Sequence, residues 1–374
     1  MSARLPFARP TLDEATVAAV ASVIRSAWIT SGPNVARFEA DLSGYLGGRT
    51  VRTMTSGTAA LELALLAAGI GPGDEVIVPA MSFAASANVV LRVGARPVFV
   101  DVELASRNMD VTKIEAAITR KTRAIMPVHF AGLPVDMDRL LALCAHHKLR
   151  LVEDAAHAIG TLWRGKRIGS FGDLTCFSFH PNKNMTTIEG GAIAVANPAE
   201  CRVIDAERFH GIEKDADGNV DVIRAGGKYN LSDISAVIGI RQLAQLDGFS
   251  ARRRQLADIY FERFGGRPPG VLPACGDDGH CWNMFTLLLP FKRLGMSRVE
   301  FIKAMSNHNI ALGIHYPCIP ALSAYRQLGF DPALFPNASR VGEETVTLPL
   351  FPTMADDDVH RVCDAIGQVL GNRA

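Results

Sequence analysis

The stretch Leu149-Arg-Leu-Val-Glu-Asp154 decides the fold class predicted for this chain. It is short and apolar and ends in a carboxylate, which is typical of a strand buried on both faces of a sheet. We therefore predict a strand at Arg150–Glu153. Segments of the same kind, rich in Val and Ile, predict further strands at Glu75–Val78, Pro97–Val102, Ala124–Val128, Leu174–Phe179 and Ala192–Val195.

Helical patterns lie between these strands. The predicted helices are Ala59–Ala68, Ala84–Val93, Val111–Ile118 and Met137–His147. Turn signals separate them from the strands, as in Gly71-Pro-Gly-Asp74. Strands that alternate with helices in this way predict an α/β fold with a mostly parallel, doubly wound sheet.

A second, smaller unit is predicted after the sheet. The helical pattern of Ser232–Leu246 continues through Arg252-Arg253-Arg254 to Phe264, and the arginine run is interpreted as an exposed helix face. We place the boundary within this long helix, with a large domain at 1–248 and a small α+β domain at 249–374. A helix is also predicted at Leu12–Ala27, and the tail is predicted to hold a strand at Phe285–Pro290 and helices at Arg298–His308 and Ala355–Leu370.

Composition narrows the class of protein. Lys and Arg number 39 against 38 Asp and Glu in 374 residues, a net charge of +1, which argues against a general nucleic-acid binder. The start, MSARLPFARP, lacks the apolar core of a signal peptide, and no stretch is long and apolar enough to predict a membrane span. The 7 cysteines are scattered and suit reduced thiols. We expect a cytoplasmic protein without a metal site.

A phosphate site is predicted at Ser56-Gly57-Thr58, which opens a helix. Backbone N–H groups and the positive end of the helix dipole favour an anion there. A plain N-cap would explain the same residues. The chain contains neither a P-loop motif nor the glycine pattern of dinucleotide-binding strands, so neither cofactor class is favoured.

A carboxylate at a strand end suggests a partner for a cation. Asp154 ends its predicted strand and His157 follows it. A carboxylate in this place can keep a pyridine nitrogen protonated, as pyridoxal phosphate (PLP) enzymes require. A strand-end cap for Asp154 and a partly buried histidine at His157 are the structural alternatives.

A lysine in a turn completes the set. Lys183 closes the stretch Ser178-Phe-His-Pro-Asn-Lys183, just after a predicted strand. A lysine held in this way can form a Schiff base with an aldehyde. Together with the phosphate cradle and Asp154, in this chain order, Lys183 points to PLP bound covalently at its side chain.

The chain resembles the DegT/StrS nucleotide-sugar aminotransferases, which have the aspartate-aminotransferase-like fold. The resemblance runs nearly end to end and is strongest from Leu5 to about Tyr260. The motifs that carry it are Trp28-Ile-Thr-Ser-Gly-Pro33, Thr55-Ser-Gly-Thr-Ala-Ala60, Gly71-Pro-Gly-Asp-Glu-Val76, Glu153-Asp-Ala-Ala-His157, Phe177-Ser-Phe-His-Pro-Asn-Lys183 and Glu189-Gly-Gly191.

The resemblance implies a role for each matching residue. Lys183 would hold PLP as a Schiff base and carry the proton, Asp154 would pair with the pyridine nitrogen, and His157 would lie beside the ring. The implied cofactor-binding residues also include Ser178, with the backbone of Gly57 and Thr58, for the phosphate, Phe83 for the ring face, and Asn230 from the neighbouring subunit. The family forms homodimers with shared sites. Thr30, His315 and Tyr316 match the substrate side.

The resemblance also implies the reaction. L-Glutamate would give its amine to PLP and leave as 2-oxoglutarate, and the amine would pass to a keto-sugar linked to a nucleotide diphosphate, a 4-keto sugar. The expected context is surface polysaccharide, lipopolysaccharide or amino-sugar biosynthesis. Two motifs, 26–32 and 228–233, look most like the transferase subgroup that makes UDP-4-amino-4-deoxy-L-arabinose. The region 265–330 departs from the family, including Gly279-His-Cys-Trp-Asn283, and leaves the sugar open.

Three alternatives remain. The acceptor could be a cyclitol ketone. The enzyme could be a sugar dehydratase of the same scaffold, a branch in which a histidine replaces the lysine; Lys183 disfavours this, and His180 lies three residues too early. The chain could be a binding or regulatory protein, which loss of the lysine or aspartate would indicate, and both are present.

Overall fold

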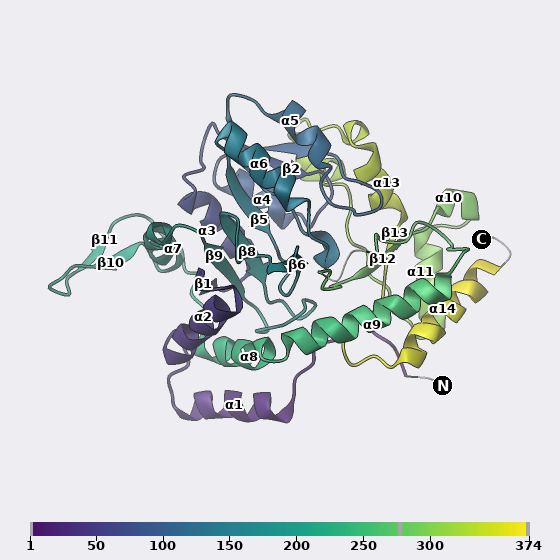
Figure 1. Cartoon of the computed structure of the whole chain (residues 1–374), viewed down its shortest axis with the longest axis horizontal. Coiled ribbons are helices and arrows are strands. Elements are labelled where there is room, and N and C mark those ends of the chain that lie inside the picture. The colour runs from purple at the N-terminus through teal and green to yellow at the C-terminus, as the bar shows by residue number, and fades with distance from the viewer. Residues whose placement is uncertain (1–2, 276–278, 372–374) are drawn as a thin grey trace.

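A seven-stranded sheet forms the centre of the protein, whose computed structural model describes residues 3–275 and 279–371 (Figure 1). In spatial order its strands are β1 (Thr50–Met54), β9 (Gly191–Val195), β8 (Leu174–Ser178), β5 (Arg150–Asp154), β4 (Thr122–Ile125), β2 (Glu75–Pro79) and β3 (Arg96–Val100). Strand β9 runs antiparallel to both β1 and β8, and the other neighbours pair in parallel. The predicted α/β fold with a mostly parallel sheet is confirmed.

All six predicted strands lie in this sheet, with ends shifted by a few residues. Strand β1 was not predicted, because its sequence, Thr-Val-Arg-Thr-Met, has little apolar content. It lies at the edge of the sheet beside β9, where fewer apolar neighbours are needed.

Helices cover both faces of the sheet. They are α1 (Glu14–Arg25), α2 (Pro33–Tyr45), α3 (Gly57–Ala67), α4 (Ala85–Arg92), α5 (Ile114–Ala117), α6 (Met137–His147), α7 (Cys201–Arg208) and α8 (Asp233–Leu243). Successive strand residues point to opposite faces, so Val76 and Val78 pack with α3 and α4, whereas Ile77 packs with α2 and α6. The sheet is therefore doubly wound, and its strand ends remain free to build a site.

Most elements of the C-terminal part pack around a separate apolar cluster. Helix α9 (Leu246–Phe264) leads into it, and Figure 1 shows α9 running from the sheet to the C-terminal part. The other elements in it are β12 (Phe285–Leu288), paired antiparallel with β13 (Thr345–Leu348), and the helices α10 (Phe291–Leu294), α11 (Arg298–Asn307) and α14 (Asp356–Leu370). Helices α12 (Ser323–Gln327) and α13 (Pro336–Glu344) instead pack into the apolar cluster of the large sheet, through Tyr325, Ala338 and Val341. The predicted boundary at 248/249 falls near the start of α9, and the division into two domains stays a prediction.

Two details of the long connection differ from the prediction. The helix is interrupted between α8 and α9, and the arginine run is not uniformly exposed. Arg253 is buried and donates hydrogen bonds to the carbonyl groups of Asn283 and Leu350. The helical pattern of the sequence could not show that Arg253 faces Asn283 and Leu350, because both residues are remote in the chain.

Two short hairpins lie outside these sheets. The pair β6 (Leu162–Trp163) and β7 (Lys166–Arg167) follows β5, and the pair β10 (Ile212–Lys214) and β11 (Val220–Val222) projects to the left of the sheet in Figure 1. Over the described ranges, 3–275 and 279–371, none of the helices has the length and apolar character that crossing a membrane requires.

Candidate functional site

A cavity of about 350 Å³ lies where the parallel strands end. In open α/β sheets this edge is the usual place for a ligand. The predicted residues that line the cavity are Gly57, Thr58, Phe83, Asp154, His157, Ser178, Lys183, His315 and Tyr316. They come from both parts of the chain, because His315 and Tyr316 follow α11 whereas the others follow strands of the large sheet.

The N-terminus of α3 forms one wall of the cavity. Ser56 caps the helix, and its Oγ accepts a hydrogen bond from the backbone N–H of Ala59 at 3.0 Å. A Cβ atom added to Gly57 would lie 2.7 Å from Cβ of Ser178, so only glycine allows the helix to approach this serine. The first N–H groups of a helix have no partner within it, so this wall suits an anion.

Asp154 ends β5, is buried and lines the same cavity. Its Oδ2 accepts a hydrogen bond from Ser86 Oγ at 2.7 Å, and its Oδ1 accepts one from the N–H of Ala156 at 3.1 Å. Burial raises the pKa of the Asp154 carboxyl, although both hydrogen bonds and the nearby Lys183 act in the other direction. A buried carboxylate with neutral donors favours a cationic ligand group beside it.

His157 is a buried, neutral side chain next to Asp154 in the cavity. Its Nδ1 accepts a hydrogen bond from the N–H of Ala131 at 3.3 Å, so the ring proton belongs on Nε2, which lies 3.3 Å from the hydroxyl oxygen of Tyr316. The two rings are stacked with 6.0 Å between centroids. Burial is the main reason that the pKa of His157 lies well below its usual range.

Lys183 follows β8 in a turn that its own backbone stabilises, since its N–H donates to the carbonyl of His180 at 2.9 Å. Burial lowers the pKa of the Lys183 amine to about 8, and Asp154 partly opposes that shift. At neutral to mildly alkaline pH a substantial fraction of this amine is unprotonated. A neutral amine is the form that attacks a carbonyl group.

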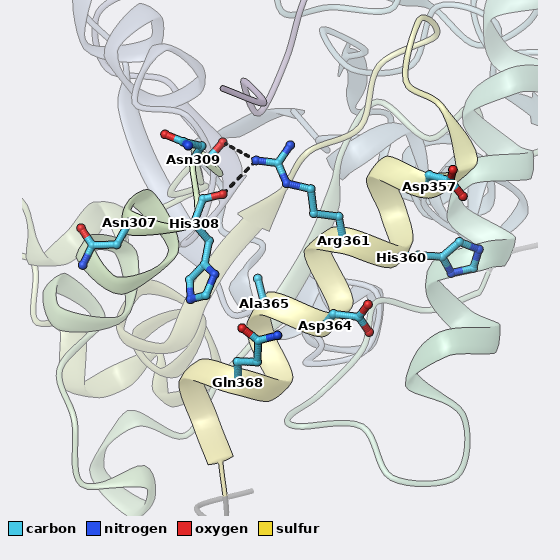
Figure 2. Close-up of a pocket in the computed structure, with 9 residues that line it drawn as sticks. All are labelled: Asn307, His308, Asn309, Asp357, His360, Arg361, Asp364, Ala365 and Gln368. Carbon is cyan, nitrogen blue, oxygen red and sulfur yellow. Dashed lines mark hydrogen bonds between the residues drawn. The ribbon is translucent and has the colours of Figure 1, made fainter. Parts of the chain in front are cut away.

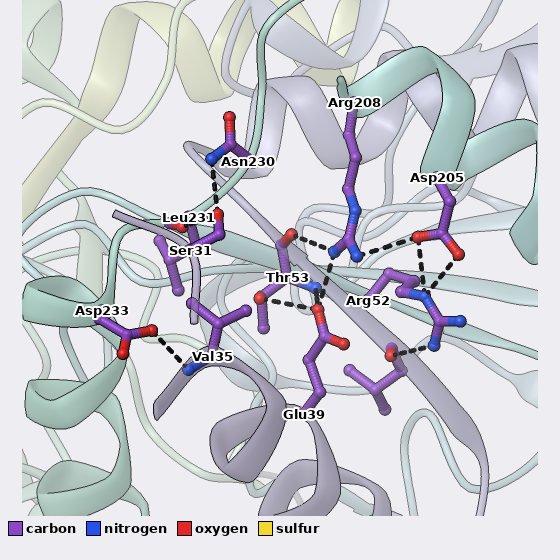
Figure 3. A network of polar contacts seen from close by, with 11 residues as sticks. Ser31, Val35, Glu39, Arg52, Thr53, Asp205, Arg208, Asn230, Leu231 and Asp233 are labelled. Carbon is purple, nitrogen blue, oxygen red and sulfur yellow. Dashed lines mark hydrogen bonds and ion pairs between the residues drawn. The ribbon is translucent and has the colours of Figure 1, made fainter. Parts of the chain in front are cut away.

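Thr30 and Asn230 do not line the cavity. Asn230 donates from Nδ2 to Ser31 Oγ at 2.6 Å, and Figure 3 shows this contact at the edge of a polar network. The carbonyl of Thr30 accepts from the N–H of Asp233 at 3.3 Å. The segments around residues 30 and 230 are therefore fastened to each other, outside the cavity of the same chain.

Ser86 is a site residue that the sequence analysis missed. Its hydroxyl contacts Asp154 across a separation of 68 positions. It lies at the start of α4, three residues after Phe83. The sequence carries no signal that pairs Ser86 with the end of β5. A small polar residue on an otherwise buried helix face was the only hint.

A larger cavity, about 550 Å³, lies between α11 and α14 and is lined by residues of the C-terminal part of the chain (Figure 2). Its most prominent cation is Arg361, whose Nη2 donates to the carbonyls of His308 and Asn309 at 2.8 and 3.4 Å. That guanidinium is engaged in holding the helix to the neighbouring turn. We therefore assign the chemistry to the smaller cavity.

The donor set of the smaller cavity fits PLP. The glycine-dependent wall of α3 suits the phosphate, the buried Asp154 carboxylate suits a protonated ring nitrogen, and Lys183 offers an amine with a lowered pKa. These three features come from β1–α3, β5 and β8 respectively, and they face one space.

Comparison with known proteins agrees with this geometry. The model of the DegT/DnrJ/EryC1/StrS aminotransferase family matches residues 10–367. The chain is 37% identical to the spore coat polysaccharide biosynthesis protein SpsC of Bacillus subtilis, over 98% of this chain and 97% of that protein. The putative sugar aminotransferase Spr1654 of Streptococcus pneumoniae, solved in its PMP form, superposes with a TM-score of 0.93 at 33% identity, covering 99% and 100% of the two chains.

The same Streptococcus pneumoniae protein in its PLP form gives a TM-score of 0.92. Helicobacter pylori PseC, an aminotransferase involved in the biosynthesis of pseudoaminic acid, gives 0.93 at 26% identity over 99% of this chain and 100% of that one. These similarities extend over both parts of the fold.

Proposed function

Because the chain belongs to the DegT/DnrJ/EryC1/StrS aminotransferase family, we propose that it moves the amino group of L-glutamate to a keto-sugar linked to a nucleotide diphosphate. It is a sugar aminotransferase and its cofactor is PLP. The proposed acceptor is a 4-keto sugar of surface polysaccharide, lipopolysaccharide or amino-sugar biosynthesis. The similarity to SpsC, a spore coat polysaccharide biosynthesis protein, supports that context.

The observation that carries the proposal is the shared cavity of Lys183, Asp154 and the N-terminus of α3. In the reaction, glutamate and the sugar exchange an amine for a carbonyl oxygen, so 2-oxoglutarate and an amino-sugar are the products. Bound PLP supplies the electron sink for the carbon that loses or gains a proton. The chain supplies the groups that bind, orient and move that proton.

Each residue has a proposed task. Lys183 holds PLP covalently and, through Nζ, moves the proton, which requires its unprotonated form. Asp154 keeps a positive charge on the ring nitrogen. His157 is neutral, is oriented by the backbone N–H of Ala131, and would lie beside the ring and its phenolic oxygen. The α3 N-terminus and Ser178 bind the phosphate, and Phe83 covers a ring face.

The experiment follows the absorbance of the purified protein with PLP, before and after L-glutamate. We expect a yellow band that glutamate bleaches, and then recovery of the band when the correct keto-sugar nucleotide accepts the amine. A band that glutamate leaves unchanged would contradict the donor. Recovery with a cyclitol ketone but with no sugar nucleotide would favour the alternative acceptor. A protein that removes water from the sugar without passing on an amine would be the dehydratase.

We also propose a homodimer in which Asn230 completes the phosphate site of the other subunit. Asn230 and Thr30 lie outside their own cavity, and the apolar side chains of Trp28 and Ile29 beside them are 59% and 49% exposed. Exposed large apolar residues next to a polar group that has no place in its own site favour an interface. Phe83, at the cavity, is also 58% exposed.

Mixing two inactive variants tests this arrangement. Lys183→Ala removes the Schiff-base amine, and Asn230→Asp places a negative charge against the phosphate. If Asn230 acts across the interface, each hybrid dimer holds one site with neither change, and random mixing restores about one quarter of the activity, as two-fold symmetry requires.

Recovery after subunit exchange should be followed by the rate of amino-sugar formation. If the mixture stays as inactive as either variant although hybrids form, Asn230 acts in its own chain and the shared site is wrong. Gel filtration of each variant is the control for assembly.

A further inference from the structure

Asn283 joins the region that departs from the family to the loop that carries Lys183. Its side chain is buried, and its Nδ2 donates to the carbonyl of Asn182 at 3.2 Å and to Oδ1 of Asn184 at 2.9 Å. These two acceptors belong to the residues on either side of Lys183. One amide group therefore holds both flanks of the lysine.

Asn184 also bonds to the segment that contains Asn283. Asn184 is also buried, and its Nδ2 donates to the carbonyl of Cys281 at 3.1 Å, while its Oδ1 accepts from Asn283. The carbonyl and amino groups of both side chains are thus assigned by the same network. The backbone N–H of Asn283 donates in turn to the carbonyl of Ala131 at 2.8 Å, which fixes its place beside the sheet edge.

Arg253 of α9 holds the other side of this segment. Its Nη1 donates to the carbonyls of Asn283 at 3.2 Å and Leu350 at 2.7 Å, and it lies 3.5 Å from that of Trp282. Burial lowers the pKa of this guanidinium to about 10, so it is charged at neutral pH. Charge-assisted hydrogen bonds in a buried place are strong, and they make the backbone around Asn283 rigid.

Rigidity matters here because Lys183 reaches the cavity through a flexible side chain. Its Nζ is placed by four methylene groups, so its position depends on where the backbone of 182–184 is held. A shift of about 1 Å at a reacting group can cost about 10²-fold in rate. Lys183 itself contributes one backbone hydrogen bond, to His180. The contacts of Asn283 and Asn184 tie this turn to the C-terminal part of the chain.

We propose that Asn283 is a positioning residue for Lys183, and that Arg253 holds Asn283 in place through its backbone carbonyl. The proposal rests on the function of Lys183 proposed above and names the groups outside the loop that set its geometry. In this proposal Asn283 touches neither substrate nor cofactor. It affects the position of Lys183 through the backbone of Asn182 and the side chain of Asn184.

The test measures how fast the apoenzyme captures PLP as a function of pH. In the wild type the rate should rise as pH passes about 8, because only the neutral Lys183 amine attacks. Asp154, His157 and His315 interact electrostatically with this amine, and His180, Glu189 and Tyr316 are further titratable residues that line the cavity. In Asn283→Ala the plateau rate above that pH should fall at least about tenfold, and kcat should fall about 10²-fold, with little change in KM for glutamate.

Asn108→Ala is the matched control. Asn108 is another buried asparagine whose Nδ2 donates to two carbonyls, those of Leu133 at 3.0 Å and Pro134 at 3.3 Å. Its replacement should lower the melting temperature about as much as Asn283→Ala, but leave the plateau rate of capture near the wild-type value. Equal plateau rates for the two variants would overturn the proposal, since Asn283 would then be merely structural.

A second variant tests the same contact in case Asn283→Ala folds poorly. Asn184→Ala removes one of the two acceptors of the Asn283 side chain, and it should slow capture in the same way. If both variants fold, the double variant should be no slower than the slower single one, because the two act as one unit. Independent, multiplying effects, or wild-type capture in Asn184→Ala, would contradict the network. A wild type that captures no PLP would instead refute the proposed function itself.

Discussion

Replacing Lys183 by alanine should lower the turnover of amino-sugar by at least about 10⁴-fold, because one substitution removes both the covalent attachment and the proton carrier. The variant should still fold, since the lysine amine supports no other part of the cavity wall, and its melting temperature should stay close to that of the wild type. The absorbance band that PLP shows on the wild-type lysine should be absent.

Three comparisons make this result specific. Lys183→Arg keeps a positive charge but cannot lose its proton, so it should be as inactive as alanine. Lys166→Ala, at an exposed position of β7, should retain full activity. A small primary amine added to Lys183→Ala should restore part of the rate by carrying the proton itself. Activity above about a tenth of wild type in Lys183→Ala would remove the lysine from the mechanism.

Replacing Asp154 by asparagine should separate activity from stability. The amide keeps the shape: its oxygen can accept from the N–H of Ala156 while its NH2 group donates to Ser86 Oγ, but it cannot hold a positive charge on the ring nitrogen. We expect kcat to fall about 10³-fold, as for other losses of buried electrostatic support. Binding of PLP should weaken less, because the phosphate wall at α3 is unchanged.

The stability of the Asp154→Asn apoenzyme should move in the opposite direction. Burial raises the pKa of Asp154, so its contribution to folding is present at low pH and is lost as pH rises through that raised pKa. Near pH 7 the carboxylate is therefore a cost that asparagine removes. The melting temperature of the apo variant near pH 7 should equal or exceed that of the wild type.

Asp101→Asn provides the contrast. Asp101 is also buried, but it accepts from the backbone N–H groups of Val102, Asn337 and Ala338, away from the cavity. Its replacement should lower the melting temperature and leave kcat unchanged. If Asp154→Asn lost stability as Asp101→Asn does, or kept its rate, Asp154 would be a structural carboxylate.

The sheet and the core of the site were accessible from sequence because they depend on local patterns. A short apolar strand that ends in a carboxylate, as at Asp154, places that group at the sheet edge, and parallel strands bring such edges together. Lys183 follows β8 for the same reason, and Gly57 opens a helix that the sequence also predicts, so their meeting in one cavity is a consequence of strand order. Strand β1, by contrast, carries too few apolar residues to be recognised.

The contacts that support the site depend on chain packing over long separations. Ser86 reaches Asp154 across 68 positions, and Asn283 reaches Asn184 across 99. No periodicity connects such pairs, because hydrogen bonds between remote segments follow from how the two parts of the chain dock. Arg253 is a further example. Its helix was predicted from sequence, but the carbonyls that accept hydrogen bonds from its guanidinium belong to the remote residues Asn283 and Leu350.

By itself, the sequence determined the α/β class, the chemistry of the phosphate wall, the carboxylate and the lysine, and hence the cofactor, because each is a local pattern of residue types at a strand end. Only the tertiary structure decided which groups support Asp154 and Lys183, and that Thr30 and Asn230 lie outside their own cavity. Those answers depend on which distant surfaces meet, which is set by packing of the whole chain and not by any single stretch of it.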